Sequence, residues 1–292
     1  MALRVAATLC FALMAALIKL AVARGASPLE TIFYRSAFGL VPVIGWVVAG
    51  PGLGSVRTPR WRAHATRTAI GLTGMFFVFE ALARLPLAEA TAIAFMAPLF
   101  ATVLSGPMLG EKIGPHRWFA IAIGFAGMIV VTQPGGAGAP EPFALALAAI
   151  AAVFQSLVAI TIRQIGATEP ATTTVFWFTA VCTLATAPML PWIARGHDAG
   201  TWAVLAGLGL AGGCAQLLMT ASLRFAPVST VAPLDYLQLL WAALLGWLLF
   251  ATLPTAAVLG GGALIAAGGL YTFHREHRRR AAGVAQRTGP AI

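Results

Sequence analysis

Long runs of uncharged apolar residues, each about the length of a membrane-spanning helix, dominate this sequence. Only 10% of the 292 residues are charged and 59% are hydrophobic, whereas a soluble domain carries roughly 25% charged residues to solvate its surface. Because a helix needs about 20 apolar residues to cross the hydrocarbon, the chain has room for about ten spans joined by short loops. The sequence therefore predicts an all-α integral membrane protein with ten transmembrane helices.

The expected helices are the apolar runs cut at their turn and charge signals. They cover residues 3–22, 30–48, 66–83, 88–106, 115–132, 142–162, 170–190, 202–221, 228–250 and 254–273.

The basic residues are concentrated on one side of the expected membrane. With the N-terminus inside, fourteen of the nineteen Lys and Arg residues fall in inner segments, Arg4 and Arg67 among them. Only Arg24, Arg84 and Arg195 fall in outer loops. This bias predicts a multi-pass protein of the cell (inner) membrane with both termini in the cytoplasm. Because the basic residues are scattered in short segments between apolar runs, the net charge of +10 indicates topology and the lipid bilayer as partner, not nucleic acid.

A Gly/Pro-rich linker at residues 133–140 divides the expected helices into five and five. An odd number of spans per half makes the second half start on the opposite side of the membrane, so the sequence predicts two inverted five-helix repeats. The expected domains are a first repeat at 1–135, a second at 141–275 and a basic cytoplasmic tail at 276–292. Inverted repeats are typical of secondary transporters, whose binding site lies near the midplane between them.

Two segments carry a resemblance to a known family. Phe11-Ala12-Leu13-Met14 with Lys19, Pro28 and Phe33-Tyr34-Arg35 resembles the first two helices of the drug/metabolite transporter superfamily, EamA family. The segment from Ala81 to Lys112 is similar to the third and fourth helices, with Phe95-Met96-Ala97-Pro98 at its centre and Gly110-Glu111-Lys112 at its exit. The second half departs from this pattern at residues 250–253, where the family often repeats a Gly-Glu pair.

The resemblance implies a secondary transporter of small metabolites that works by alternating access. Amino acids, aromatic ones included, are the expected small-molecule substrates, and export is the expected direction; the aromatic amino-acid exporter branch is one home for such a chain. Uptake, or multidrug efflux of another small organic solute, is the alternative. The oligomeric state is open between monomer and homodimer.

Lys19, Arg35 and Glu80 stand out among the ionisable residues inside expected spans, and each lies within about two turns of an outer end. Ionisable groups within spans are costly and tend to be functional. They form either an interfacial ion-pair cluster with outward-reaching basic side chains or an outer gate. In the second case Lys19 or Arg35 would bind a substrate carboxylate.

Asp235 has no basic residue within one helical turn in the sequence. A buried carboxylate must be neutralised by protonation or by a distant partner. Asp235 is therefore either a proton-coupling or amine-binding group, or a paired structural residue near a broken helix start.

Pro98 and Pro233 occupy corresponding places in the two halves, inside the fourth and ninth expected helices. A proline there removes a backbone hydrogen bond and kinks the helix, which is tolerated at membrane depth where the backbone is buried or lines a cavity. Aromatic and polar residues near mid-depth complete the expected cavity. The expected cavity residues are Phe79, Glu80, Phe95, Pro98, Gln155, Trp177, Asp235, Tyr236 and Gln238.

Enzyme and channel functions find little support in the sequence. All five histidines fall in expected loops, in the tail or, for His116, at the very end of an expected span, and no His-Glu-x-x-His pair or nucleotide-binding Gly-x-x-x-x-Gly-Lys-Ser/Thr loop occurs. No ring of like charges or filter-like repeat indicates a channel. We expect no catalytic residue, no metal and no cofactor.

Overall fold

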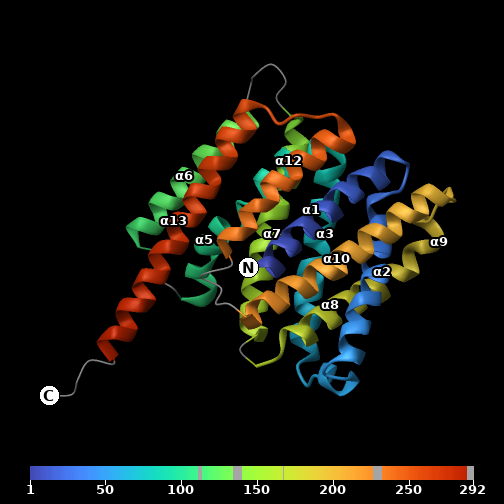
Figure 1. Ribbon diagram of the computed structural model, residues 1–292, viewed down its shortest axis with the longest axis horizontal. Helices are drawn as coiled ribbons and strands as arrows, with labels where there is room; N and C mark the ends of the chain where they lie inside the picture. Colours follow the sequence, from blue (N-terminus) through green and yellow to red (C-terminus); the bar gives the residue numbers. More distant parts are fainter. Residues whose placement is uncertain (111–113, 134–139, 167, 226–231, 288–292) are drawn as a thin grey trace.

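The computed structural model describes residues 1–110, 114–133, 140–166, 168–225 and 232–287, and throughout these ranges the regular structure is helical (Figure 1). The first half contains α1 (Ala2–Ala23), α2 (Pro28–Ala49), η1 (Leu53–Val56), α3 (Trp61–Arg84), α4 (Leu87–Ala94), α5 (Ala97–Leu109) and α6 (Pro115–Thr132). The second half contains α7 (Pro142–Gly166), α8 (Ala171–Thr186), η2 (Ala187–Met189), α9 (Leu190–Ile193), α10 (Ala199–Phe225), η3 (Ala232–Tyr236), α12 (Leu237–Phe250) and α13 (Ala256–Arg287).

Seven helical segments among the described residues are long and apolar enough to cross a membrane. Two shorter apolar helices, Leu234–Phe250 and Ala256–Tyr271, follow them. Helix α3 is long enough but opens with polar turns that carry Arg62, His64 and Arg67. The described part of the chain is thus all-helical, with the helices of a multi-pass membrane protein. The ten crossings and the inverted relation of the halves stay predictions, and most of the linker at 133–140 lies outside the described residues.

The prolines expected to kink helices mark helix breaks instead. The run 88–106 is two helices, and the chain turns at Phe95 and Met96 before α5 begins. Pro98 therefore lies in the first turn of α5, where a missing backbone N–H costs nothing. Pro233 belongs to the short 3-10 segment η3 ahead of α12. The expectation of two interior prolines is wrong in this respect.

The most extensive helix contacts join the first half of the chain to the second. Helix α6 packs along α13, α1 along α10, and α3 along α7, while α2 packs against both α10 and α8. When the helices are numbered as the five expected spans of each half, with α4 and α5 counted as one span, the pairs are reciprocal. The first span of each half packs on the third span of the other half. The second span of one half packs on the second span of the other, and the fifth on the fifth. The two halves interleave instead of forming two separate bundles, and Figure 1 shows α6 beside α13 at one side of the assembly.

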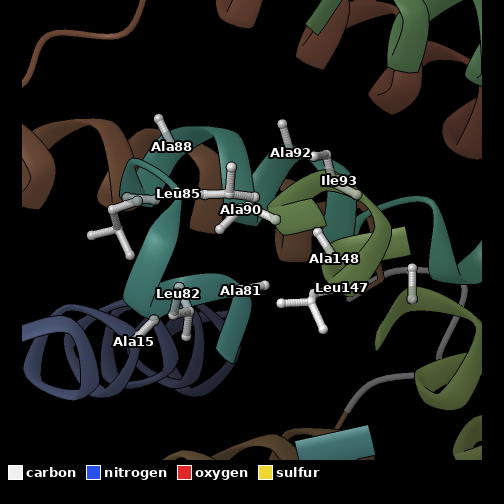
Figure 2. Packing of buried hydrophobic residues seen from close by; sticks show 14 of the residues in the cluster. Ala15, Ala81, Leu82, Leu85, Ala88, Ala90, Ala92, Ile93, Leu147 and Ala148 are labelled. Atoms are coloured by element: carbon white, nitrogen blue, oxygen red, sulfur yellow. The ribbon is translucent and has the colours of Figure 1, made fainter. Parts of the chain in front are cut away.

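The main core cluster lies where α1, α3, α4 and α7 meet, and its many alanines allow these helices to pack closely. Leu82 of α3 lies against Ala15 of α1, and Leu147 and Ala148 of α7 approach α4 (Figure 2). Alanine and glycine permit close backbone approach, which is how helices associate where lipid provides no hydrophobic drive.

Glycines bring α6 and α13 into backbone contact. A Cβ on Gly261 would lie 2.5 Å from the Gly127 carbonyl oxygen and 2.8 Å from the Val131 nitrogen, while neighbouring Gly260 is exposed with nothing within 4 Å. The close approach therefore depends on Gly261 and not on glycine content in general.

We expect Gly261→Ala to lower the stability of the detergent-purified protein by about 1–3 kcal/mol, because the added methyl forces the helices apart. Gly260→Ala is the matched control, and it should be neutral or stabilising by up to about 1 kcal/mol through helix propensity. Thermal unfolding followed by circular dichroism measures both. Equal melting temperatures for the two variants would contradict this packing.

Candidate functional site

The two helix breaks face each other across the interface of the halves. Phe95, at the α4–α5 break, stacks on Tyr236, at the η3–α12 break, with ring centroids 4.9 Å apart and an interplanar angle of 29°. Gly269 of α13 leaves room for the Tyr236 hydroxyl, which a Cβ at that position would meet. The structure thus brings together two of the residues predicted to line a central site, one from each half.

Asp235 is paired with an arginine from the far end of the sequence. Arg4 Nε donates to Asp235 Oδ1 at 2.6 Å and Arg4 Nη2 donates to Oδ2 at 2.5 Å. Arg4 is buried inside α1, although its place near the N-terminus had suggested only a topology signal. The bidentate pair satisfies the carboxylate without protonation. This geometry favours the paired structural reading of Asp235 over the proton-coupling reading.

The trio Lys19, Arg35 and Glu80 is not brought together. The Lys19 ammonium donates to the carbonyls of Leu82 and Leu85, at 3.3 Å and 2.8 Å. Glu80 instead pairs with Arg84, four residues along α3. Among the described residues no hydrogen bond or ion pair joins these three side chains to one another, and the outer gate stays a prediction.

The remaining predicted cavity residues have different surroundings. Phe79 is 1% exposed and belongs to the apolar core. Trp177 donates its indole N–H to the Val56 carbonyl at 2.7 Å, which fixes its side chain to the α2–α3 connection. Gln155 of α7 and Gln238 of α12 are half-buried.

Sequence reasoning missed two buried or half-buried charged residues inside helices, Arg67 and Glu89, and the ring contact of a third, Arg35. Arg67 of α3 is 5% exposed, although it had been counted with the inner topology signals. Glu89, in the first turn of α4, has one carboxylate oxygen buried without a hydrogen-bond partner. Arg35 was singled out, but its partner ring, Phe178 of α8, was not. Glu89 lies three residues after Pro86, at the start of a helix, where an acidic residue is ordinary, so the sequence did not mark it as a buried charge.

One carboxylate ties the α2–α3 connection to the α7–α8 connection. Glu169 Oε2 lies 2.5 Å from His64 Nε2, and its other oxygen accepts from the Thr58 hydroxyl. Burial alone would raise the pKa of Glu169, but the hydrogen bonds from Thr58 and His64 and the nearby charge of Arg60 hold that pKa below its ordinary value of 4.5. The carboxylate is therefore ionised at neutral pH and the tie is formed there.

A second carboxylate ties the start of α2 to the segment before α10. Glu30 is fully buried and completes a capping box with Ser27. Its Oε1 also accepts from the Arg195 backbone N–H at 3.2 Å and lies 2.9 Å from His197 Nε2. Glu30 and Glu169 thus each join the first half of the chain to the second.

Comparison with known proteins gives the same family match in both halves. The sequence pattern of the EamA-like transporter family matches residues 1–133 and 142–273. The pseudopaline exporter CntI of Pseudomonas aeruginosa is 29% identical over 266 residues, which cover 90% of this chain and 92% of that protein.

Other relatives and a solved structure cover similar lengths. A riboflavin transporter of Rhizobium johnstonii is 32% identical over 78% of this chain and 75% of its own. An S-adenosylmethionine uptake transporter of Rickettsia prowazekii is 25% identical over 85% and 84%. One crystal structure superposes with a TM-score of 0.63 at 23% identity, covering 94% of this chain and 98% of the other, a likeness of fold.

The Arg4–Asp235 pair makes a direct prediction for stability. Asp235→Leu leaves the Arg4 guanidinium buried without its acceptor, and we expect a loss of roughly 1–3 kcal/mol. Arg4→Met combined with Asp235→Leu should recover most of it, because replacing both partners of a buried pair by apolar groups is often near neutral. Thermal unfolding in detergent measures the cycle. Glu141→Leu, at an exposed carboxylate, is the control; additive losses in the double variant would refute the pair.

Proposed function

Because the chain belongs to the EamA-like transporter family of the drug/metabolite transporter superfamily, it is a small-molecule transporter, and we propose that it works as a secondary carrier by alternating access. In this proposal two inverted five-helix repeats, 1–135 and 141–275, exchange conformations around a site between them. The tail, 276–292, and the N-terminus face the cytoplasm. The host bilayer is the bacterial inner membrane.

The observation that carries the proposal is the reciprocal packing of the halves. Each half matches the same family pattern, and the first helix of each packs on the third of the other, as α1 does on α10 and α3 on α7. Inverted halves of this kind can exchange their conformations, which would open the site first to one side of the membrane and then to the other, as alternating access requires. The stack of Phe95 on Tyr236 lies where the two broken helices meet.

Polar ties at both ends of the assembly support a gating role. In the proposed topology His64–Glu169 and Arg4–Asp235 lie on the cytoplasmic side, and Glu30–His197 lies on the outer side. Each tie joins the two halves. Opening toward one side would break the ties at that side and leave those at the other intact, so few contacts would decide which side is open.

Direction and substrate remain proposals. The three named relatives are a pseudopaline exporter, a riboflavin transporter and an S-adenosylmethionine uptake transporter, and none of them is named as an amino-acid exporter. We retain export of small metabolites, with amino acids as one class in the test. Uptake, or multidrug efflux, is the alternative that the relatives' names keep equally open. The family and the relatives' names support transport and not catalysis.

Purified protein in liposomes tests the carrier mechanism. We expect saturable uptake of a labelled solute from a panel of amino acids, riboflavin and S-adenosylmethionine, with counterflow when the same unlabelled solute is inside. Counterflow arises because a carrier returns loaded faster than it returns empty. Empty liposomes are the control. Linear, unsaturable flux without counterflow would show a channel instead.

A further inference from the structure

Two arginine side chains converge on one aromatic ring inside the helix assembly. The guanidinium carbon of Arg35, on α2, lies 5.7 Å from the centre of the Phe178 ring, on α8. The guanidinium carbon of Arg67, on α3, lies 3.8 Å from the same centre. Both arginines are only 5% exposed. Two positive charges from the first half of the chain therefore share one buried ring from the second half.

The described residues supply no carboxylate counter-charge to this pair. Within the described ranges neither guanidinium has a carboxylate partner, and Arg67 Nε and Nη1 are buried without a hydrogen-bond acceptor. Arg4 differs in this respect, because it donates to both carboxylate oxygens of Asp235. A buried charge without a partner is costly, and its cation–π contact with Phe178 offsets only part of that cost. The free donors are available to an acceptor from outside the chain.

Glycines shape the space around both guanidinium groups. A Cβ on Gly71 would lie 2.6 Å from Arg67 Nη1 and 2.7 Å from Phe178 Cε2. A Cβ on Gly212, on α10, would lie 3.3 Å from Arg35 Nε. Glycine at these two positions therefore leaves the space that the two guanidinium groups occupy.

We propose that Arg35 and Arg67 form a binding site for the anionic group, a carboxylate or a phosphate, of the transported solute. A guanidinium offers paired N–H donors that match either group, and the face of Phe178 provides an apolar surface for the attached organic part. The proposal rests on the carrier function, because groups this deeply buried become accessible only when the halves rearrange. It adds a substrate class, organic anions, that the carrier mechanism alone does not specify.

Ligand-dependent thermal stability of the detergent-purified protein tests the site directly. The probes are succinate and inorganic phosphate, with neutral succinamide and sodium chloride of equal ionic strength as controls. We expect a saturable rise in melting temperature with at least one of the two anions and none with succinamide or chloride, because binding to the folded state stabilises it. A response to succinate alone assigns a carboxylate, and a response to phosphate alone assigns a phosphate.

Variants separate a binding role from a structural one. Arg67→Met and Arg35→Met should weaken the anion response about 10- to 100-fold, the loss expected for charge-assisted hydrogen bonds. Arg67→Met should also keep or raise the melting temperature without ligand, because it removes an unpaired buried charge; a purely structural arginine would lower it. Arg67→Lys keeps the charge, loses the planar fork and should weaken the response less. Arg62→Met, exposed on the same helix, should leave it unchanged.

The outcomes distinguish this site from the carrier mechanism. Equal shifts with chloride and with both anions, or an unchanged response in Arg67→Met and Arg67→Lys, would overturn the anion site. Saturable counterflow of a neutral solute that survives both Met substitutions would overturn it as well, while supporting the carrier. An anion response that depends on both arginines, in a protein without counterflow, would support the site and contradict the carrier.

Discussion

Charged side chains inside an apolar helix assembly have to find their partners within it, because the surrounding hydrocarbon offers no hydrogen bonds. Arg4 and Asp235 meet this requirement by pairing across 231 positions of sequence. Lys19 meets it with the carbonyls of Leu82 and Leu85 at the end of α3. In each case the hydrogen bonds of the charged group hold one helical segment against another, so the partners of these charges help to determine how the helices pack. The arginines at Phe178 lack such a partner among the described residues, and this absence is what suggests a ligand.

The reciprocal contacts between the halves create one core that both halves share. Because α1 packs on α10 and α3 on α7, neither half has a core that is independent of the other. The ties through Glu30 and Glu169 lie at the ends of this shared core. In the proposed carrier mechanism, a rearrangement of the halves would exchange contacts between them and leave the interior of the helices intact.

The helices could be predicted from sequence because apolar runs and breakers are local signals. The expected run 3–22 is α1 and the run 142–162 lies within α7. The helix breaks were located to within a few residues by Pro98 and Pro233, although prolines of the first turn do not kink a helix. What a local pattern cannot give is a partner that lies far away in the sequence.

The site shows that limit residue by residue. Asp235 was identifiable as unusual, but its partner Arg4 lies at the other end of the chain. The partner of Glu80, Arg84, could be predicted from sequence, because a spacing of four residues places both side chains on one helix face. Arg67 resembled a topology signal because it lies near the start of α3. The grouping of Arg35 with Phe178 exists only in three dimensions.

The inverted relation of the two halves is the central claim, and the sidedness of two equivalent connections tests it most directly. Gly54, between α2 and α3, and Gly196, between α9 and α10, are both exposed with open space around them, and each follows the second expected span of its half. In a variant without Cys10, Cys182 and Cys214, single cysteines at these positions are labelled in intact cells with a membrane-impermeant maleimide. The account predicts labelling of Gly196→Cys from outside and of Gly54→Cys only after the cells are opened. Labelling of both from the same side would contradict it.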